Sequence, residues 1–344
     1  MQQIWEKHQL LHHYTTAAGL KGILESQTLW ATHYKHLNDT TEIEHFREPL
    51  EQAIFPLIKD IALKYFRSSF RVRREIRKLG GVISVAEREA KGFIGSFYKT
   101  IFERGRDEPP FAEPFITSFC AHDDDEAYER ENGLLSQWRA YADGGYVLVF
   151  DTRKLWELED IESRIYHLTA LSLGDVVYEG DNEAFQEEFS ELIKIIKDLF
   201  IVFLDKEKPF DAGHTFEPFV SSAARYKHQG FKEEREVRFV ICPMTEEMSE
   251  VIAKMDPKYR PEDKQLKTIK LRTDGERKIP YVELFDYEKK RHLPIKKIIV
   301  GPHRDQAALE DTVSQLVSDL RLNIAVKCSE TPYIGGKSAI GVTA

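Results

Sequence analysis

The segment spanning residues 231–240 constrains the fold more than any other part of the chain. It places Glu234, Glu236 and Arg238 at the start of an apolar strand. Because successive side chains of a strand point to opposite faces, Glu234 and Glu236 are expected on one face. Two adjacent carboxylates repel each other, so either cations balance them or they take part in chemistry. The same pattern also fits a solvated edge strand with lysine and arginine neighbours.

The composition is that of an ordinary globular protein. The chain has 344 residues, of which 42% are hydrophobic and 31% are charged, and its net charge is −9. This is ample apolar material for a core. The negative charge excludes a uniformly basic nucleic-acid-binding surface but leaves room for a local basic patch.

Cysteine usage and apolar runs indicate the compartment. Cys120, Cys242 and Cys328 lie far apart with no Cys-x-x-Cys motif, which disfavours a disulfide framework and a zinc knuckle. The first residues lack the apolar core of a signal peptide. The run at residues 199–204 is too short to cross a bilayer. We therefore expect a cytoplasmic protein without a membrane partner.

Strands and helices interleave without the regular alternation of a doubly wound sheet, which predicts an α+β fold. Helices are expected after Thr16 and at residues 134–141, 181–204 and 306–320. We interpret residues 1–344 as one elaborated domain with a helical insertion at 43–106. The polar stretch 257–278 is expected to form a loop or an irregular excursion. Strands are expected at residues 12–15, 29–33, 115–120, 146–150, 234–242, 295–300 and 322–327.

His13 and Thr15 share one face of the first expected strand. A histidine at such a position is commonly a core residue with satisfied hydrogen bonds. The histidines at positions 12, 13, 33 and 36 are clustered, but their spacing fits no ligand pattern, so no metal site is expected. Ser118 lies in a buried strand and could be an ordinary strand serine.

Trp138 and Tyr141 fall on one face of the helix expected at 134–141. They are most simply core residues of an amphipathic helix. The alternative is that one ring lines a pocket for a planar ligand.

Residues 64–78 form a basic stretch with interleaved aromatic residues. It contains seven lysines and arginines against the single acidic residue Glu75. The stretch suits either a solvated helix face or a patch that contacts phosphates and stacks bases of single-stranded nucleic acid. The candidate nucleic-acid-binding residues are Arg67, Arg71, Arg74 and Lys78.

Several of these segments together resemble a bacterial family, the domain-of-unknown-function family 2971. Residues 13–15, 19–24, 29–31 and 37–42 are similar to its opening, and residues 136–143 to its central motif. Some relatives carry abortive-infection, or phage-defence, labels. The resemblance therefore implies a toxin, with an antitoxin protein as a possible partner. The late motif of the family is matched by Lys227, Phe231, Glu234, Glu236 and Arg238, and its closing strand by residues 299–302.

The order of the segments also resembles that of ADP-ribosyltransferases. A strand with His-x-Thr, a short helix, a return strand, a serine-bearing strand, an aromatic helix and a late glutamate follow one another. The resemblance implies a split β-sheet core with helical insertions, NAD as the substrate and no metal. By this resemblance, His13 would bind the NAD ribose and Thr15 would support it. Ser118 would be the equivalent of the serine on the central strand of such enzymes. Nicotinamide would stack on Trp138 or Tyr141.

The same resemblance makes Glu236 the catalytic carboxylate and Glu234 the residue that orients the acceptor. Cleavage of the nicotinamide–ribose bond builds positive charge on the sugar, as glycoside hydrolysis does, and a fixed carboxylate stabilises that charge. We therefore expect an NAD-dependent ADP-ribosyltransferase that acts as a phage-defence toxin. Its acceptor would be a protein, RNA or DNA.

Three alternatives remain open. The first is a non-enzymatic sensor that binds a nucleotide or a phage component. The second is a nuclease that holds a divalent ion with Glu234, Glu236 and Asp39. The third is a structural protein without a small-molecule site.

Overall fold

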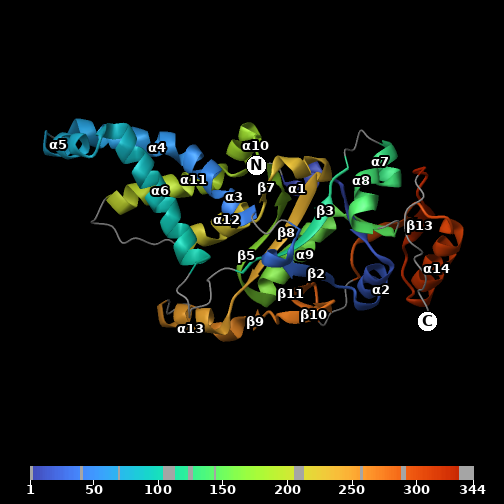
Figure 1. Cartoon of the computed structure of the whole chain (residues 1–344). Coiled ribbons are helices and arrows are strands. Elements are labelled where there is room, and N and C mark those ends of the chain that lie inside the picture. The colour runs from blue at the N-terminus through green and yellow to red at the C-terminus, as the bar shows by residue number, and fades with distance from the viewer. Residues whose placement is uncertain are drawn as a thin grey trace.

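The computed structural model describes residues 3–38, 42–68, 70–103, 113–122, 127–142, 145–204, 213–255, 259–287 and 292–332. Helices and strands are mixed around one large sheet (Figure 1). Within the described ranges, eleven strands join in this sheet. They are β1 (Leu10–Thr15), β2 (Leu29–His33), β3 (Phe115–Cys120), β4 (Tyr146–Asp151), β5 (Tyr166–Asp175), β8 (Glu236–Pro243), β9 (Gln265–Leu266), β10 (Lys270–Asp274), β11 (Arg277–Leu284), β12 (Ile295–Val300) and β13 (Ala325–Cys328).

The sheet divides along one edge of β3. On its other edge β3 pairs with β8 over its whole length, from Phe115 to Cys120, and β8 pairs in turn with β5. Along the dividing edge, the first residues of β3 pair with β2, which continues to β11 and β10. Its last residue pairs with β1, which continues to β4, β12 and β13. Ser118 therefore lies opposite a gap between β1 and β2.

One face of the sheet packs against three helices. These are α2 (Ala17–Ser26), α9 (Thr152–Ile165) and α14 (Gln306–Asp319), whose apolar side chains share a core with β1, β3, β8, β11 and β12. Thr16 caps α2 by accepting a hydrogen bond from the Gly19 amide, as the sequence predicts. Along β8, Val237, Phe239 and Ile241 point into this core. Glu236 and Arg238 therefore point to the opposite face.

A second apolar core is built from helices. It joins α4 (Arg47–Ser68) and α6 (Gly81–Ile101) to α10 (Asn182–Glu188), α11 (Ser190–Leu204) and α12 (Gly213–Ala223). With α5 (Phe70–Lys78), the first two form an arm that extends away from the sheet, whereas α3 (Glu42–His45) lies near the sheet and contacts α12 (Figure 1). The helices of the arm lie within residues 43–106, the stretch expected to be a helical insertion, of which residues 69 and 104–106 lie outside the described residues.

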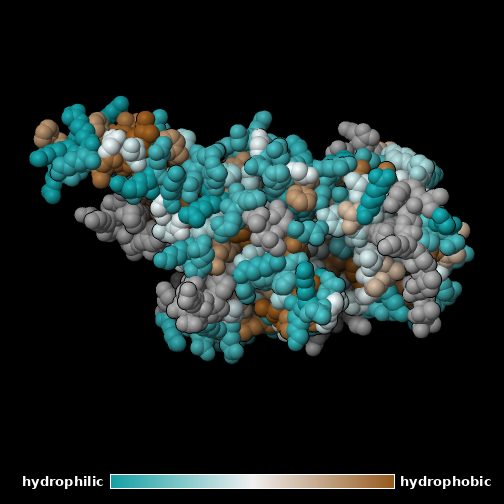
Figure 2. All heavy atoms as spheres, viewed as in Figure 1, coloured by the Kyte–Doolittle hydropathy of each residue, from teal (hydrophilic) through white to brown (hydrophobic). Residues whose placement is uncertain are grey.

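The end of the arm exposes both basic and apolar side chains. Figure 2 shows hydrophilic and hydrophobic residues mixed there. Arg67, Arg71, Arg74 and Lys78 are exposed, and so are Phe70 and Leu79. The four candidate nucleic-acid-binding residues thus lie together on the arm, away from the sheet.

The remaining elements are short. A two-stranded parallel pair, β6 (Val177–Tyr178) and β7 (Tyr226–Lys227), lies beside β8. The other helices are α1 (Ile4–Lys7), α7 (Ala127–Asn132), α8 (Leu135–Gln137) and α13 (Glu246–Met255), with 3-10 turns η1 (Tyr34–His36), η3 (Gln229–Glu234) and η4 (Pro261–Asp263) and the π-helical turn η2 (Trp138–Ala142). Within the described ranges, no helix has the length and apolar character needed to cross a membrane.

Two sequence expectations differ from the structure. The stretch 257–278 is not a loop, because β10 lies within it and pairs with β11. The strand is an exposed edge with polar side chains on both faces, so it lacks the apolar alternation that reveals a strand. The helix expected at 134–141 is the short α8 followed by η2.

Candidate functional site

A cavity of about 320 Å³ opens where the sheet divides. Its walls come from β1, β2, β3, β8 and β10, together with η2, η3 and the segment after η1. His13, Ser118, Tyr141, Glu234 and Glu236 all line it. The division therefore brings most of the predicted site residues, which lie far apart in the sequence, to one cavity.

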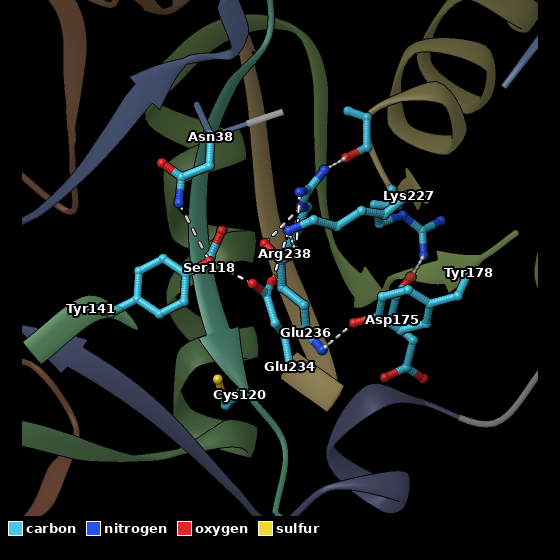
Figure 3. Close-up of polar contacts among 12 residues, drawn as sticks. Asn38, Ser118, Cys120, Tyr141, Asp175, Tyr178, Lys227, Glu234, Glu236 and Arg238 are labelled. Carbon is cyan, nitrogen blue, oxygen red and sulfur yellow. Dashed lines mark hydrogen bonds and ion pairs between the residues drawn. The ribbon is translucent and has the colours of Figure 1, made fainter. Parts of the chain in front are cut away.

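Four charged side chains form what we call the cavity cluster: Lys227, Glu234, Glu236 and Arg238 (Figure 3). The ammonium of Lys227 lies 2.7 Å from Glu234 Oε2 and 2.9 Å from Glu236 Oε2. Arg238 donates from Nε to Glu236 Oε1 at 2.8 Å. Two cations thus balance two anions, which answers the repulsion implied by the Glu-x-Glu pattern.

Glu236 is a fixed anion, only 4% exposed. Burial opposes its ionisation, but Arg238 and Lys227 outweigh burial, and the Ser118 hydroxyl also donates to it, so the pKa of Glu236 is lowered to about 2. Its backbone amide is held by the Tyr178 hydroxyl at 2.8 Å. A carboxylate that stays charged at neutral pH suits electrostatic stabilisation of a cation better than proton transfer.

The chain turns sharply between the two glutamates. Glu234 ends η3, Arg235 adopts a left-handed backbone with φ 44°, and β8 begins at Glu236. The expectation that both glutamates share one strand face is therefore wrong. The carboxylates still meet, because the turn at Arg235 and the bridging ammonium of Lys227 bring them together.

Tyr141 forms the opposite wall of the cluster. Its hydroxyl donates to Glu234 Oε1 at 2.5 Å and accepts a weaker hydrogen bond from Asn38 Nδ2 at 3.4 Å. Burial and the adjacent Glu234 raise the pKa of Tyr141, so the hydroxyl keeps its proton. Figure 3 shows Tyr141 and Asn38 on one side of the carboxylates, with Lys227 and Arg238 on the other.

His13 reaches the cavity from β1. Its Nδ1 lies 2.9 Å from the carbonyl oxygen of Ser118, the residue opposite the gap between β1 and β2. Burial lowers the pKa of His13, so its ring is neutral. Because a carbonyl only accepts, Nδ1 carries the proton and Nε2 keeps a free lone pair. The His13 side chain therefore donates to the Ser118 carbonyl at the divided edge, and its Nε2 can still accept a hydrogen bond.

Two of the predicted NAD-binding residues lie outside the cavity. Trp138 is fully buried, donates from its indole nitrogen to the Asn132 carbonyl at 3.0 Å, and packs edge-to-face on Tyr14. Thr15 is not among the lining residues. An α-helix would align Trp138 with Tyr141, but the wider π-helical turn separates residues three apart. Tyr141 is thus the aromatic residue that faces the cavity.

Three cavity residues lie outside the predicted set of site residues, although Trp30 and Asn38 fall within the segments that resemble the opening of the family. Asn38 follows η1, Trp30 lies on β2, and Arg272 lies on β10, within the stretch expected to be a loop. Arg238 could have been placed from strand alternation with Glu236. Lys227 comes from a two-residue strand, for which no local pattern exists.

The cavity cluster does not have the arrangement expected of a metal site. The ammonium of Lys227 bonds both carboxylates and occupies the position between them. Among the residues that the structure describes, no group of three or more histidine, cysteine, aspartate or glutamate side chains could hold a metal ion. Asp39, a ligand in the nuclease interpretation, lies outside the described residues.

The comparisons with known proteins give one match. A family model described as "Protein of unknown function (DUF2971)" matches residues 137–239, less than half of the chain. This segment contains Tyr141 and the whole cavity cluster, and it supports the resemblance to that family. No curated protein and no solved structure matches the chain.

Proposed function

We propose that this protein is an NAD-dependent ADP-ribosyltransferase. The observation that carries the proposal is that His13 and the ionised Glu236, 223 positions apart in the sequence, line one cavity where the sheet divides. A divided sheet with an early histidine and a late glutamate is also what the resemblance to such enzymes implies. The resemblance to the domain-of-unknown-function family adds phage defence as the setting, with the cytoplasm as the compartment.

The residues suit cleavage of the nicotinamide–ribose bond. As that bond breaks, nicotinamide leaves with the bonding electrons, and positive charge develops on the ribose. Glu236 is a fixed anion that would stabilise this charge without moving. The flat ring of Tyr141 would hold nicotinamide, and Nε2 of His13 would accept from a ribose hydroxyl.

Glu234 would orient the acceptor, which forms the new bond to the ribose and loses a proton. This carboxylate is the most exposed member of the cavity cluster, with 13% of its side chain accessible. It is held by Lys227 and Tyr141. The acceptor remains a macromolecule of either kind, protein or nucleic acid, and an antitoxin protein remains the proposed partner.

One observation favours a second candidate, a nucleotide-binding protein without turnover. Both oxygens of Glu236 are engaged by Arg238 and Lys227, as in a structural ion-pair network. The nuclease interpretation is less favoured, because Lys227 holds both carboxylates where a divalent ion would bind.

The test uses NAD labelled in its adenylate half. The protein is incubated with labelled NAD and with pools of protein, RNA and DNA, and both free nicotinamide and labelled polymer are measured. We expect nicotinamide release and labelling of one pool, both unaffected by a chelator. Binding of NAD without release of nicotinamide would instead favour the second candidate.

The decisive variant is Glu236→Gln, which removes the charge but keeps the shape. We expect nicotinamide release to fall about 100- to 1,000-fold, as when one charge-stabilising group is lost. The matched control is Glu162→Gln, a buried glutamate paired with Lys267 outside the cavity. Circular dichroism checks folding in both variants. Full activity in folded Glu236→Gln protein would refute the assignment.

A further inference from the structure

The outer wall of the cavity carries a second group of side chains that the proposed reaction does not use. Trp30 and Thr32 on β2 and Arg272 on β10 line the cavity beside the residues already described. In the register of β2, β11 and β10, Thr32 lies opposite Tyr281 and Trp30 opposite Glu283. Strand alternation then puts Trp30, Thr32, Tyr281 and Arg272 on one face of these three strands.

Trp30 is an exposed ring backed by another ring. It is 46% exposed, and its centroid lies 4.4 Å from that of the buried Tyr281, at an interplanar angle of 34°. Single exposed apolar residues are common on protein surfaces and need no explanation. What distinguishes Trp30 is that Tyr281 supports one side of the ring while the residue lines the cavity. Such a supported ring suits stacking of a planar base.

Arg272 adds a donor for an anion. Its Nε is buried and, within the described part of the chain, has no hydrogen-bond partner. A buried guanidinium nitrogen without an acceptor costs free energy until a ligand supplies one. A phosphate matches a guanidinium especially well, because it accepts two parallel hydrogen bonds.

The size of the cavity indicates where such a ligand would lie. About 320 Å³ is near the lower end of the roughly 300–1,000 Å³ that small-molecule sites span. A dinucleotide with its nicotinamide riboside beside Glu236 would fill this space and extend over the rim. The rim is where Trp30 and Arg272 lie.

We propose that this rim is the subsite for the adenosine-phosphate half of NAD, in which Trp30 stacks on adenine and Arg272 pairs with the pyrophosphate. The inference rests on the proposed function for the identity of the dinucleotide. The shared chemistry, a planar base joined to a phosphate, could also come from a nucleotide of a single-stranded acceptor. The stacked pair and the buried Nε of Arg272 fit one nucleotide unit.

The test uses ADP, which lacks the nicotinamide riboside and cannot be turned over. ADP is titrated into the full chain, and binding is followed by tryptophan fluorescence and by calorimetry. We expect saturable quenching in the wild type. Trp30→Ala should abolish the quenching and weaken binding roughly tenfold or more, in line with the loss of one stacked base. Trp30→Phe should bind with intermediate affinity.

Arg272→Gln should weaken the binding of ADP more than the binding of adenosine, because only ADP presents phosphates. Two matched controls lie outside the cavity lining. Trp156→Ala removes another exposed tryptophan, on α9, and Arg277→Gln removes an exposed arginine from the same hairpin. Both controls should bind ADP as the wild type does.

The outcomes separate this inference from the proposed function. ADP binding that is equal in Trp30→Ala and wild type, or no ADP binding in a protein that consumes NAD, overturns the subsite. Quenching of Trp30 by a short oligonucleotide but not by ADP overturns its assignment to NAD. Trp30-dependent ADP binding without nicotinamide release supports the subsite while the proposed reaction fails.

Discussion

Two of the buried networks of opposite charges among the described residues differ in what surrounds them. The cavity cluster borders the space at the divided sheet. The second, which we call the closed cluster, consists of Glu162, Lys267, Asp286 and Tyr166. There the ammonium of Lys267 contacts Glu162, lies 2.6 Å from Asp286 Oδ1, and stands over the Tyr166 ring at 3.8 Å.

The closed cluster satisfies its own members. The second oxygen of Glu162 accepts from the Phe285 amide at 3.1 Å, and the Tyr166 hydroxyl donates to Asp286 at 2.8 Å. It ties α9 and the start of β5 to the end of β11. The cavity cluster instead has Tyr141, Asn38 and Ser118 around it, on the cavity wall. Burial and ion pairing alone therefore do not mark a site, whereas an adjoining cavity with further polar groups does.

The largest expected effect would test whether the closed cluster is purely structural. Lys267→Met removes the ammonium and leaves two carboxylates buried together. We expect the free energy of unfolding to fall by about 3–5 kcal/mol, measured by urea denaturation. The folded fraction should still bind ADP and release nicotinamide. The control is Lys270→Met, which breaks a more exposed pair with Glu283 and should cost no more than about 1 kcal/mol.

A loss of less than about 1 kcal/mol in Lys267→Met would show that Lys267 is not needed to balance the closed cluster. A folded Lys267→Met protein without catalytic activity would contradict a purely structural role of the closed cluster. It would mean that the closed cluster also serves the reaction.

The pH dependence of stability should have opposite signs in the two clusters. The pKa of Glu236 is lowered from 4.5 to about 2, so its charge stabilises the fold above pH 4.5, and this contribution is lost as the pH falls towards 2. The full contribution is roughly 3 kcal/mol, of which about 2 kcal/mol is lost by pH 3. The stability difference between wild type and Glu236→Gln should therefore shrink on acidification.

Glu162 should behave in the reverse way. Burial raises its pKa despite the attraction of Lys267, so the contribution of its proton is present at low pH and lost as the pH rises. Relative to wild type, Glu162→Gln should thus gain stability with rising pH. Denaturation midpoints of both variants from pH 3 to 8 provide the measurement. Curves that move in the same direction for both variants would contradict the distinction.

Parts of the fold could be predicted because they follow local patterns. The strands at 29–33 and 115–120 have the predicted bounds, because each is a short run in which apolar and β-branched residues predominate. The exposed strand β10 could not be predicted, because it lacks the alternation of apolar and polar side chains that marks a half-buried strand.

Site residues could be predicted only where strand alternation or the resemblance to known families identified them. His13, Ser118, Tyr141, Glu234 and Glu236 were all expected, and all line one cavity. The positions of Trp30 and Arg272 depend on how β2, β10 and β11 pair across the sheet, and that of Asn38 depends on the segment after η1. Such pairing joins residues more than 200 positions apart, which no local pattern encodes.

A smaller effect would sharpen the role of Glu234. Tyr141→Phe keeps the ring but removes the hydrogen bond to the Glu234 carboxylate. We expect a loss of about 1 kcal/mol in unfolding free energy and roughly tenfold slower transfer to the acceptor. Nicotinamide release should be nearly unchanged, because water then takes the ADP-ribosyl group and free ADP-ribose forms in place of labelled acceptor. The two products are measured separately in one assay with labelled NAD.

Tyr166→Phe is the matched control, because it removes the same kind of bond, to Asp286, from the closed cluster. It should cost similar stability and leave transfer unchanged. Equal slowing of transfer and nicotinamide release in Tyr141→Phe would mean that the hydroxyl supports Glu236 rather than the acceptor.

The smallest effect concerns the arm, which lies outside both clusters. Arg71→Gln with Arg74→Gln removes two exposed cations from α5. Stability should change by less than about 0.5 kcal/mol, and nicotinamide release should not change. If the acceptor is single-stranded nucleic acid that contacts the arm, transfer should weaken, and the slope of log affinity against log salt should fall by about 0.7 for each lost phosphate contact. Lys91→Gln, on α6 of the same arm, is the control for a general charge effect. Unchanged transfer and salt dependence in the double variant would leave the arm without a part in acceptor binding, so that recognition would be confined to the cavity and its rim.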